Sequence, residues 1–185
     1  MTDLEKYCKT VYEPADVVEL RLINKRDDVR KKKWTFAKDM PQMETELKKL
    51  NQQGYCVYVG PNPRKSKGLS GDDNVLLARC LFCDFDHIEP LDGCGPAEFV
   101  TCEIIEAGLP EPNLVINSGH GIHTYWRLSE PITDMNRWRQ IQEKLNHTLK
   151  ADSSIKNAER IMRLPGFLNL KFKPFVESFI VYENI

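Results

Sequence analysis

The segment from residue 113 to 128 places the strongest constraint on the fold of this chain. Two short stretches rich in strand-forming residues, NLVIN at 113–117 and IHTYWRL at 122–128, flank the small-residue turn Ser118-Gly119-His120-Gly121. Turns of this kind join antiparallel strands, so the sequence predicts a β-hairpin. The chain therefore has to contain antiparallel β-structure.

The other periodic segments alternate between strands and helices. Strands are predicted at 17–23, 33–37, 55–59 and 75–86, and near 167–172 and 175–183. Helices are predicted at 41–53, 96–107 and 133–149, where the apolar spacing is helical and proline, glycine or a capping residue marks an end. The segment 60–74, rich in Gly, Pro, Ser and charge, predicts a long exposed loop. Together these elements indicate an α+β fold.

Length and composition indicate one ordinary domain. A chain of 185 residues with 41% hydrophobic and 29% charged residues can bury a core, and we expect 1–185 to fold as a unit. No apolar stretch approaches a membrane span and the N-terminus resembles no signal peptide, so we expect a cytoplasmic protein with no membrane partner. The ending FIVYENI indicates either a domain edge within a longer protein or a natural end in a strand.

The six cysteines and the net charge each lead to an expectation about the chemistry of the chain. Without a secretory signal the cysteines are expected to be reduced thiols, and Cys80 and Cys83 to be buried in a strand rather than to hold zinc. The net charge of −1 gives no overall basic field. Basic residues nevertheless gather at 25–38 and at 156–173, which are either solvated surfaces or local nucleic-acid contacts.

Two carboxylates end the predicted strand 75–86. Side chains alternate along a strand, so Asp84 and Asp86 project from one face. Magnesium is commonly bound by one or two carboxylates together with substrate phosphates. Strand ends also carry solvated acids, and the pair alone does not separate these two interpretations.

The predicted hairpin carries a polar and aromatic face. His123, Tyr125 and Arg127 alternate with apolar residues, so they share one side of the strand. Gly119 and Gly121 allow backbone N–H groups to approach an anion, and His123 can donate to a phosphate oxygen. An ordinary hairpin with a surface histidine is the alternative.

A third cluster of polar residues lies between 152 and 171. Arg163 offers a planar fork suited to phosphate, Lys171 offers a mobile charge, and Pro165-Gly166 predicts a turn between them. Asp152 lies in a polar turn upstream, where an acid either caps a helix or supplies a third metal ligand.

These segments, in this order, resemble the motifs of the archaeo-eukaryotic primase superfamily, especially its plasmid-, phage- and CRISPR-associated primase-polymerases. The resemblance runs from about residue 55 to residue 171. Its motifs are acid-x-acid, Ser-Gly-x-Gly-x-His, an apolar residue before Asp, and Arg-x-Pro-Gly-x-x-Asn-x-Lys. The matching residues are Asp84 and Asp86; Ser118, Gly119, Gly121 and His123; Ala151 and Asp152; and Arg163, Pro165, Gly166, Asn169 and Lys171.

The resemblance implies a fold, an activity and a site. The fold is an N-terminal α/β unit, about 1–75, joined to an RRM-like antiparallel catalytic sheet, about 76–185. The implied activity is template-directed nucleotidyl transfer by a DNA primase or polymerase, with two Mg²⁺ or Mn²⁺ ions on the three aspartates. The implied nucleotide-binding residues are Ser118, Gly119, Gly121, His123, Arg163, Asn169 and Lys171, with His123 also catalytic, and Arg64 reaching nucleotide or template.

The implied partners are a single-stranded or primed DNA template and a dNTP or NTP. Stacking of bases on Tyr125 or Trp126 would add to template binding. The chain has no Gly-x4-Gly-Lys-Ser/Thr loop, so a helicase would be a separate domain or protein. Two alternatives remain open: a catalytically silent single-strand or origin-binding module, and a metal-dependent nuclease.

Overall fold

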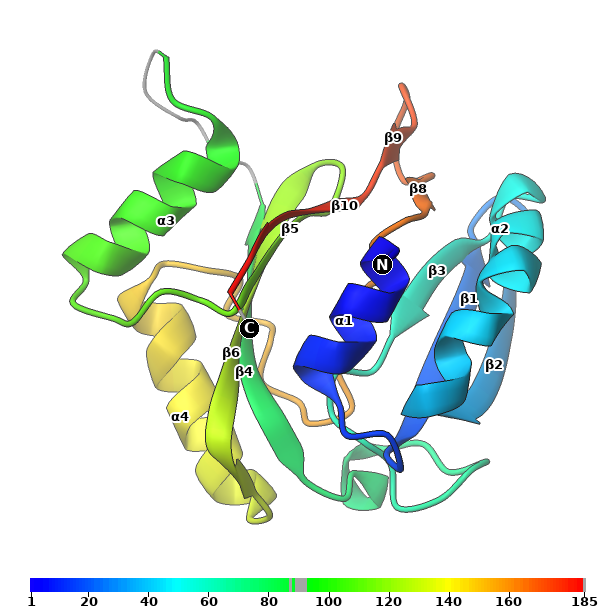
Figure 1. The fold of residues 1–185 in the computed structure, drawn as a ribbon, viewed down its shortest axis with the longest axis horizontal. Coiled ribbons are helices and arrows are strands. Elements are labelled where there is room, and N and C mark those ends of the chain that lie inside the picture. Colours follow the sequence, from blue (N-terminus) through cyan, green and yellow to red (C-terminus); the bar gives the residue numbers. More distant parts are fainter. Residues whose placement is uncertain (87, 89–92, 185) are drawn as a thin grey trace.

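Two antiparallel sheets lie side by side in the computed structural model, which describes residues 1–86, 88 and 93–184. The first sheet has the order β2-β1-β3-β7 (Figure 1). Its strands are β1 (Val17–Asn24), β2 (Val29–Phe36), β3 (Cys56–Val59) and β7 (Met162–Arg163). Its inward face is apolar because Val18, Leu20 and Leu22 alternate along β1 and are fully buried.

Two helices and a 3₁₀ segment accompany the first sheet. Helix α1 (Asp3–Val11) lies between the two sheets in Figure 1, and it packs with both through one shared core. Sequence patterns did not predict α1, although Thr2 and Glu5 form a capping box at its start. The helix expected at 41–53 begins later, as α2 (Glu44–Gln52), because the 3₁₀ segment Ala37–Met43 precedes it.

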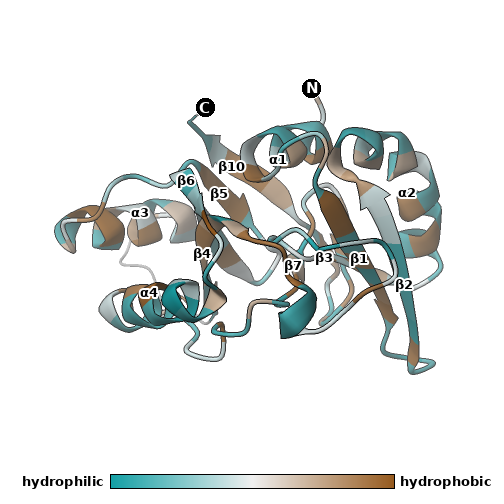
Figure 2. Ribbon diagram, turned by 90° about the horizontal axis from the view of Figure 1, so that it is seen from below, coloured by the Kyte–Doolittle hydropathy of each residue, from teal (hydrophilic) through white to brown (hydrophobic). Residues whose placement is uncertain are grey.

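The second sheet has the order β10-β5-β6-β4, and all of its neighbouring strands are antiparallel. Its strands are β4 (Ala78–Asp86), β5 (Leu114–Asn117), β6 (Gly121–Ile132) and β10 (Phe179–Glu183). Helices α3 (Pro96–Glu106) and α4 (Met135–Thr148) pack against it. Figure 2 shows apolar residues on the strands of this sheet and on α3. The predicted hairpin and the mixed α+β class are confirmed.

Edge strand β4 is held in place by α4. The side-chain amide of Gln142 accepts from the Phe82 N–H at 3.2 Å and donates to the Phe82 carbonyl at 2.6 Å. The indole of Trp138 donates to the Cys80 carbonyl at 3.1 Å. These contacts pair backbone groups that an edge strand otherwise leaves exposed, and they anchor the strand that carries the two carboxylates.

The C-terminal part of the chain contributes to both sheets. Strand β7 pairs with β3, with Arg163 opposite Tyr58, so a segment far beyond residue 75 completes the first sheet. The expected division at about residue 75 is therefore incomplete. After β7 the short strands β8 (Leu168–Asn169) and β9 (Val176–Glu177) form a hairpin, and the 3₁₀ turn Asp72–Asn74 closes the loop after β3.

The cysteine pair of β4 is buried, as predicted. Cys80 and Cys83 are both 0% exposed and belong to the hydrophobic clusters on opposite faces of the sheet. Burial raises the pKa of the Cys80 thiol to about 12, so it stays protonated. The two sulfur atoms point in opposite directions and cannot bind one ion together.

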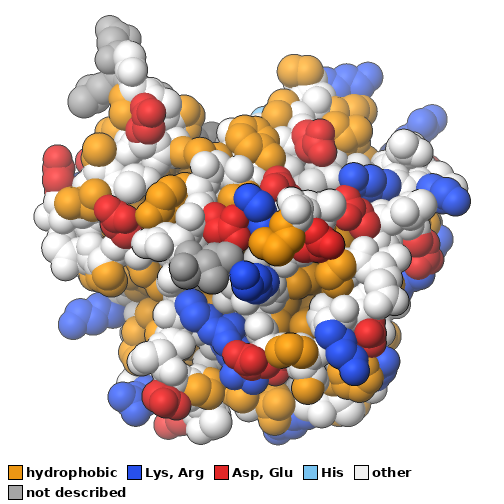
Figure 3. Space-filling view, viewed as in Figure 1, with side chains coloured by type: hydrophobic (Ala, Val, Ile, Leu, Met, Phe, Trp, Pro, Cys, Tyr) orange, Lys and Arg blue, Asp and Glu red, His pale blue; other side chains and the backbone are white. Residues whose placement is uncertain are grey.

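Within the described residues, no helix has the length and apolar content that crossing a bilayer requires. On the face seen in Figure 3, acidic and basic side chains are interspersed, which agrees with the net charge of −1.

Candidate active site

The register of β4 and β6 brings two sequence motifs together. Asp84 pairs with His123, and Asp86 pairs with Gly121 at the start of the second hairpin strand. The acid-x-acid segment and the Gly-x-Gly-x-His segment are distant in sequence but adjacent in the sheet. One end of the sheet therefore carries two carboxylates and an imidazole on neighbouring strands.

Asp84 is the most strongly perturbed carboxyl group of the site. Its pKa is raised to about 7, first because the group is buried and then because Asp86 and Asp152 repel its charge. Its Oδ1 atom is buried without a hydrogen-bond partner among the described residues. A carboxylate in this state is stabilised by a cation.

Asp152 reaches the same region through the backbone. Its N–H donates to the Asp84 carbonyl oxygen at 2.9 Å, which ties the turn after α4 to β4. Its carboxylate accepts from the Ser154 N–H and hydroxyl and from the Arg160 guanidinium, at 3.1 Å in the last case. Burial by itself raises the pKa of Asp152, but the contacts with Ser154 and Arg160 outweigh this and lower it.

A divalent cation fits these donors. Among the described residues no three carboxylate, histidine or cysteine groups converge as a ready-made cluster, because Asp152 is turned toward Arg160. However, the unpartnered Asp84 oxygen and the three mutually repelling carboxylates are the donors that Mg²⁺ or Mn²⁺ prefers. Asp84 and Asp86 would hold the ion. Asp152 would become a ligand if its carboxylate gave up the ion pair with Arg160 and bound the ion instead.

His123 is neutral at physiological pH. Its pKa is lowered to about 3, mainly by complete burial and next by the charge of Arg163. Its Nε2 lies 3.5 Å from the Asp84 carboxylate, and its Nδ1 has no partner in the described part of the chain. A neutral imidazole keeps one N–H donor and one acceptor, which suits contact with a phosphate oxygen.

Basic side chains form the opposite wall of a pocket of about 220 Å³ beside the carboxylates. Arg163 donates to the Tyr58 hydroxyl at 3.1 Å, and its Nη1 has no partner within the described residues. Lys171 lines the same wall. The structure thus brings together most of the predicted residues: Asp84, Asp86, Ser118, His123, Arg163, Asn169 and Lys171.

Four further polar residues of this pocket were not assigned to the site from the sequence. Lys25 and Arg160 stood out only as members of basic segments, and nothing marked Tyr58 or His120. The pairing of β7 with β3 explains why Tyr58 lies in this pocket, because it sets Tyr58 opposite Arg163. Sequence alone carries no signal for that pairing, since β7 has two residues.

The glycines of the hairpin have a packing role. A Cβ at Gly121 would lie 2.5 Å from the Phe85 carbonyl oxygen, so only glycine lets β6 approach β4 here. Gly119 has a φ of +94°, and its N–H already donates to the Asn117 side chain. The structure explains Gly121 by close strand packing and Gly119 by turn geometry, and the Gly119 N–H is already paired with a side chain.

Asn169 and Ser118 also position their neighbours. Asn169 is 2% exposed, and its amide donates to the Ser118 carbonyl at 2.8 Å while its Oδ1 accepts from the Lys171 N–H at 3.0 Å. The Ser118 hydroxyl donates to the Gly121 carbonyl at 3.1 Å. These bonds connect the glycine turn to the segment that carries Lys171.

A second pocket, of about 770 Å³, lies on the other side of the carboxylates. It contains Asp84, Asp86 and Asp152, and its walls come from α3, from the end of α4 and from the turn after α4. The two pockets share Asp84 and Asp86. The carboxylates therefore stand between a basic pocket and a wider, partly apolar one.

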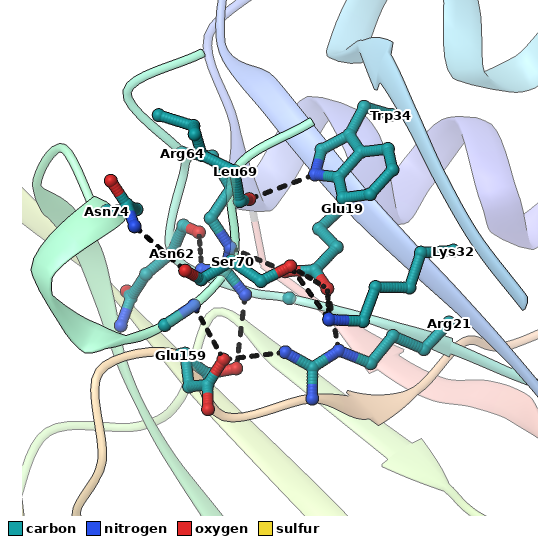
Figure 4. A network of polar contacts seen from close by, with 12 residues as sticks. Glu19, Arg21, Lys32, Trp34, Asn62, Arg64, Leu69, Ser70, Asn74 and Glu159 are labelled. Carbon is teal, nitrogen blue, oxygen red and sulfur yellow. Dashed lines mark hydrogen bonds and ion pairs between the residues drawn. The ribbon is translucent and has the colours of Figure 1, made fainter. Parts of the chain in front are cut away.

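The structure contradicts the expectation that Arg64 reaches a nucleotide or template. Its side chain is 0% exposed, and it donates to the Glu19 carboxylate at 2.8 Å and to the Asn62 and Glu159 carbonyls (Figure 4). Residues 60–64 are buried, so this part of the loop is not exposed either. The position is buried because β1 pairs with the loop at Arg64.

The buried network around Glu19 links three parts of the chain. Burial raises the pKa of Glu19, but bonds from Arg21 and Arg64 outweigh this and lower it, so the carboxylate stays charged. Arg21 also donates to the Glu159 carboxylate at 2.7 Å (Figure 4). The network thereby anchors the residues just before Arg160 and Arg163, which face the pocket.

The expected stacking of bases on Tyr125 or Trp126 is also wrong. Tyr125 is 0% exposed and packs against Tyr7 and Phe82 in the core. Trp126 is 8% exposed, and its indole donates to the Pro110 carbonyl at 2.8 Å. Helices cover both faces of this sheet, so neither ring is available to a base.

Comparison with known proteins finds one relative by sequence and several solved structures with a similar fold. The chain is 38% identical over 149 residues to a replication protein of Clostridium perfringens. This match covers 76% of the chain but 36% of the relative, so the chain spans about a third of the length of that relative. No family model matches the sequence.

Solved structures match almost the whole chain. The AEP domain of the primase-polymerase of cyanophage S-2L has a TM-score of 0.72 at 20% identity, covering 98% of this chain and 89% of that one. Primase RepB′ has a TM-score of 0.72 at 16% identity, covering 98% and 55%. Its catalytic domain in complex with initiator DNA has a TM-score of 0.70 at 16% identity, covering 98% and 85%.

We predict that Asp84→Asn stabilises the metal-free protein at pH 8. The folded-state pKa of about 7 exceeds the ordinary value of 3.8, so ionising Asp84 costs folding energy as pH rises from about 4 through 7. Denaturant unfolding in EDTA should show a gain on the order of 2 kcal/mol at pH 8 that vanishes near pH 4. Asp73→Asn, on an exposed turn, is the control, and destabilisation by Asp84→Asn at pH 8 would contradict the prediction.

We predict that Arg64→Ala lowers the free energy of unfolding by about 3 kcal/mol, because Glu19 remains buried with an incomplete set of partners. Urea denaturation followed by circular dichroism measures this change. Arg30→Ala is the control, since Arg30 is 75% exposed and its change should stay within about 0.5 kcal/mol. Equal denaturation midpoints for Arg64→Ala and the unaltered protein would show that the network contributes nothing.

Proposed function

Because this chain has the archaeo-eukaryotic primase fold, we propose that it is the catalytic domain of a replication primase-polymerase. The reaction would be template-directed transfer of a nucleotide from a dNTP or NTP to a growing strand, with a single-stranded or primed DNA as partner. The 38% identity to a replication protein supports a role in replication. The DNA that we propose it copies is a plasmid, a phage or another mobile element, or the product of CRISPR-associated synthesis. A helicase in a further domain or protein would open the duplex.

One observation carries this proposal. The pocket of about 220 Å³ is lined by the carboxylates Asp84 and Asp86 and also by His123 and the cations Arg163 and Lys171. A nucleoside triphosphate needs both kinds of side chain, because its phosphates bind cations while its reacting phosphorus must lie near metal ions. A nuclease has no use for a triphosphate-binding wall.

The residues divide the work in a definite way. Two divalent ions on Asp84, Asp86 and Asp152 would supply positive charge at the attacking and leaving oxygens. Arg163 offers an Nη1 donor that has no partner among the described residues, and Lys171 adds a mobile charge to the same pocket. His123 stays neutral and gives a single N–H, so it orients a phosphate oxygen without adding net charge.

The wider pocket suits the end of the primer. Attacking and leaving oxygens lie roughly in line in phosphoryl transfer, so the nucleophile has to approach from the side opposite the triphosphate. We call the pocket of about 220 Å³ the triphosphate pocket and the pocket of about 770 Å³ the wide pocket. The wide pocket lies on that side and shares Asp84 and Asp86 with the triphosphate pocket. A 3′-hydroxyl in it would stand next to the carboxylates.

A primer-extension reaction tests the proposal. The protein is incubated with Mn²⁺, labelled dNTP and a primed template, and the products are separated on a denaturing gel. Extension supports a polymerase, and synthesis without a primer would add priming. Retardation without extension would instead indicate a silent binding module, and shortened strands would indicate a nuclease.

We predict that Asp84→Asn and Asp86→Asn each reduce extension at least 1000-fold, on the order of the loss expected for an essential catalytic group. Each change removes a negative charge that the cations require. Asp73→Asn should extend normally, and circular dichroism should show all three variants folded. Unaltered extension by the Asp84→Asn variant would refute the metal assignment.

We predict that Arg163→Ala raises the KM for dNTP by about 10- to 100-fold, the value of a hydrogen bond to a charged group. Steady-state kinetics at saturating primed template measures the change. The exposed Arg137 on α4 provides the control, and Arg137→Ala should leave the KM unchanged. An unchanged KM for Arg163→Ala would mean that this guanidinium does not bind the triphosphate.

A further inference from the structure

A third cavity, of about 420 Å³, lies beyond the triphosphate pocket. We call it the turn–hairpin groove, because its walls are the β1–β2 turn, the end of α2 and the β8–β9 hairpin. The turn contributes Lys25, Arg26 and Asp27, and the hairpin contributes Leu168, Leu170 and Phe175. None of the functions derived so far uses this groove.

The chemistry of the groove suits an unpaired nucleotide. Phe175 is 48% exposed and Leu168 is 36% exposed, so large apolar surfaces face solvent at its edge. Lys25 and Arg26 are exposed cations that line the same groove, while Asp27 accepts a bond from the Asn24 amide at 2.9 Å. Exposed aromatic rings that stack on bases, next to cations that contact phosphates, are the two components of single-strand binding sites.

The size of the groove is also suitable. Its volume of about 420 Å³ falls at the lower end of the range of roughly 300–1,000 Å³ that small ligands occupy.

The three cavities follow one another in a fixed order. The wide pocket shares Asp84 and Asp86 with the triphosphate pocket, and the triphosphate pocket shares Lys25 with the turn–hairpin groove. In the part of the chain that the structure describes, the wide pocket and the groove share no lining residue. The groove is lined by the β1–β2 turn, α2 and the β8–β9 hairpin, whereas the wide pocket is lined by α3 and the end of α4 beside the second sheet (Figure 1).

This order determines which nucleic-acid strand the groove can bind. The primer end has to approach the carboxylates from the wide pocket, and the incoming nucleotide occupies the middle position. The next position along the template, ahead of the base being copied, then lies on the far side of the incoming nucleotide. That template nucleotide is unpaired, and its base can stack on an aromatic side chain.

We propose that the turn–hairpin groove binds the first unpaired template nucleotide ahead of the base being copied, with its base against Phe175 and its phosphate at Arg26. This inference rests on the proposed polymerase function, because that function defines the direction of the template. The groove would keep the uncopied strand turned away from the incoming base.

The test measures binding of primed templates by fluorescence anisotropy in EDTA, so that no synthesis takes place. One template carries a normal base at the position ahead of the copied base, and a second carries an abasic site there. With the unaltered protein, the abasic site should weaken binding about tenfold. With Phe175→Ala, binding of the normal template should fall by a similar factor, and the abasic site should cause no further loss.

Matched variants control for exposure and charge. Phe179 on β10 is 43% exposed and lines none of the three cavities, so Phe179→Ala should retain the full sensitivity to the abasic site. Phe175→Tyr should also retain it, because the ring is kept. Arg26→Ala should weaken both templates equally, whereas Arg137→Ala should weaken neither.

Two results would overturn the inference: equal sensitivity to the abasic site in Phe175→Ala and the unaltered protein, or no sensitivity in the unaltered protein. Primer extension by the unaltered protein in Mn²⁺ is measured separately. If extension succeeds while the abasic effect is absent, the groove assignment fails and the proposed function stands. If extension fails, the proposed function falls whatever the binding results.

Discussion

The pairing of β4 with β6 is the constraint on which the site depends. It sets Asp84 opposite His123 and Asp86 opposite Gly121, and a shift by one residue would turn both carboxylates to the other face of the sheet. Close packing at Gly121 and the bonds from α4 to the edge of β4 oppose such a shift. The same contacts that stabilise the sheet therefore determine where the acidic groups lie.

The site keeps like-charged carboxylates close together, although they repel one another. Burial and the charges of Asp86 and Asp152 raise the pKa of Asp84, and Arg160 partly neutralises Asp152. Burial and the charge of Arg163 lower the pKa of His123, which keeps it neutral. The buried network around Glu19 anchors the segment that carries these arginines. Repulsion among like charges is tolerated here because the surrounding sheets and network hold the groups in position, and cations together with phosphates would relieve it.

Much of the fold and most of the site were accessible from the sequence. Alternating apolar residues and a glycine turn predicted the hairpin, and helical spacing predicted three of the helices. The motif residues Asp84, Asp86, His123, Arg163 and Lys171 line one pocket. The resemblance to a known family implied that they share a site. Helix α1 was missed although Thr2 and Glu5, which form its capping box, stand at the right spacing in the sequence.

What the sequence by itself determined is local: which segments form strands and helices, and which residue types stand at their ends. Only the tertiary structure decided which groups are buried or meet, since pairing between distant strands and burial depend on the whole chain. Arg64 is basic and lies in a loop rich in glycine and proline, yet β1 and Glu19 enclose it. Tyr58 meets Arg163 only because a two-residue strand returns to the first sheet, and no local pattern encodes that return.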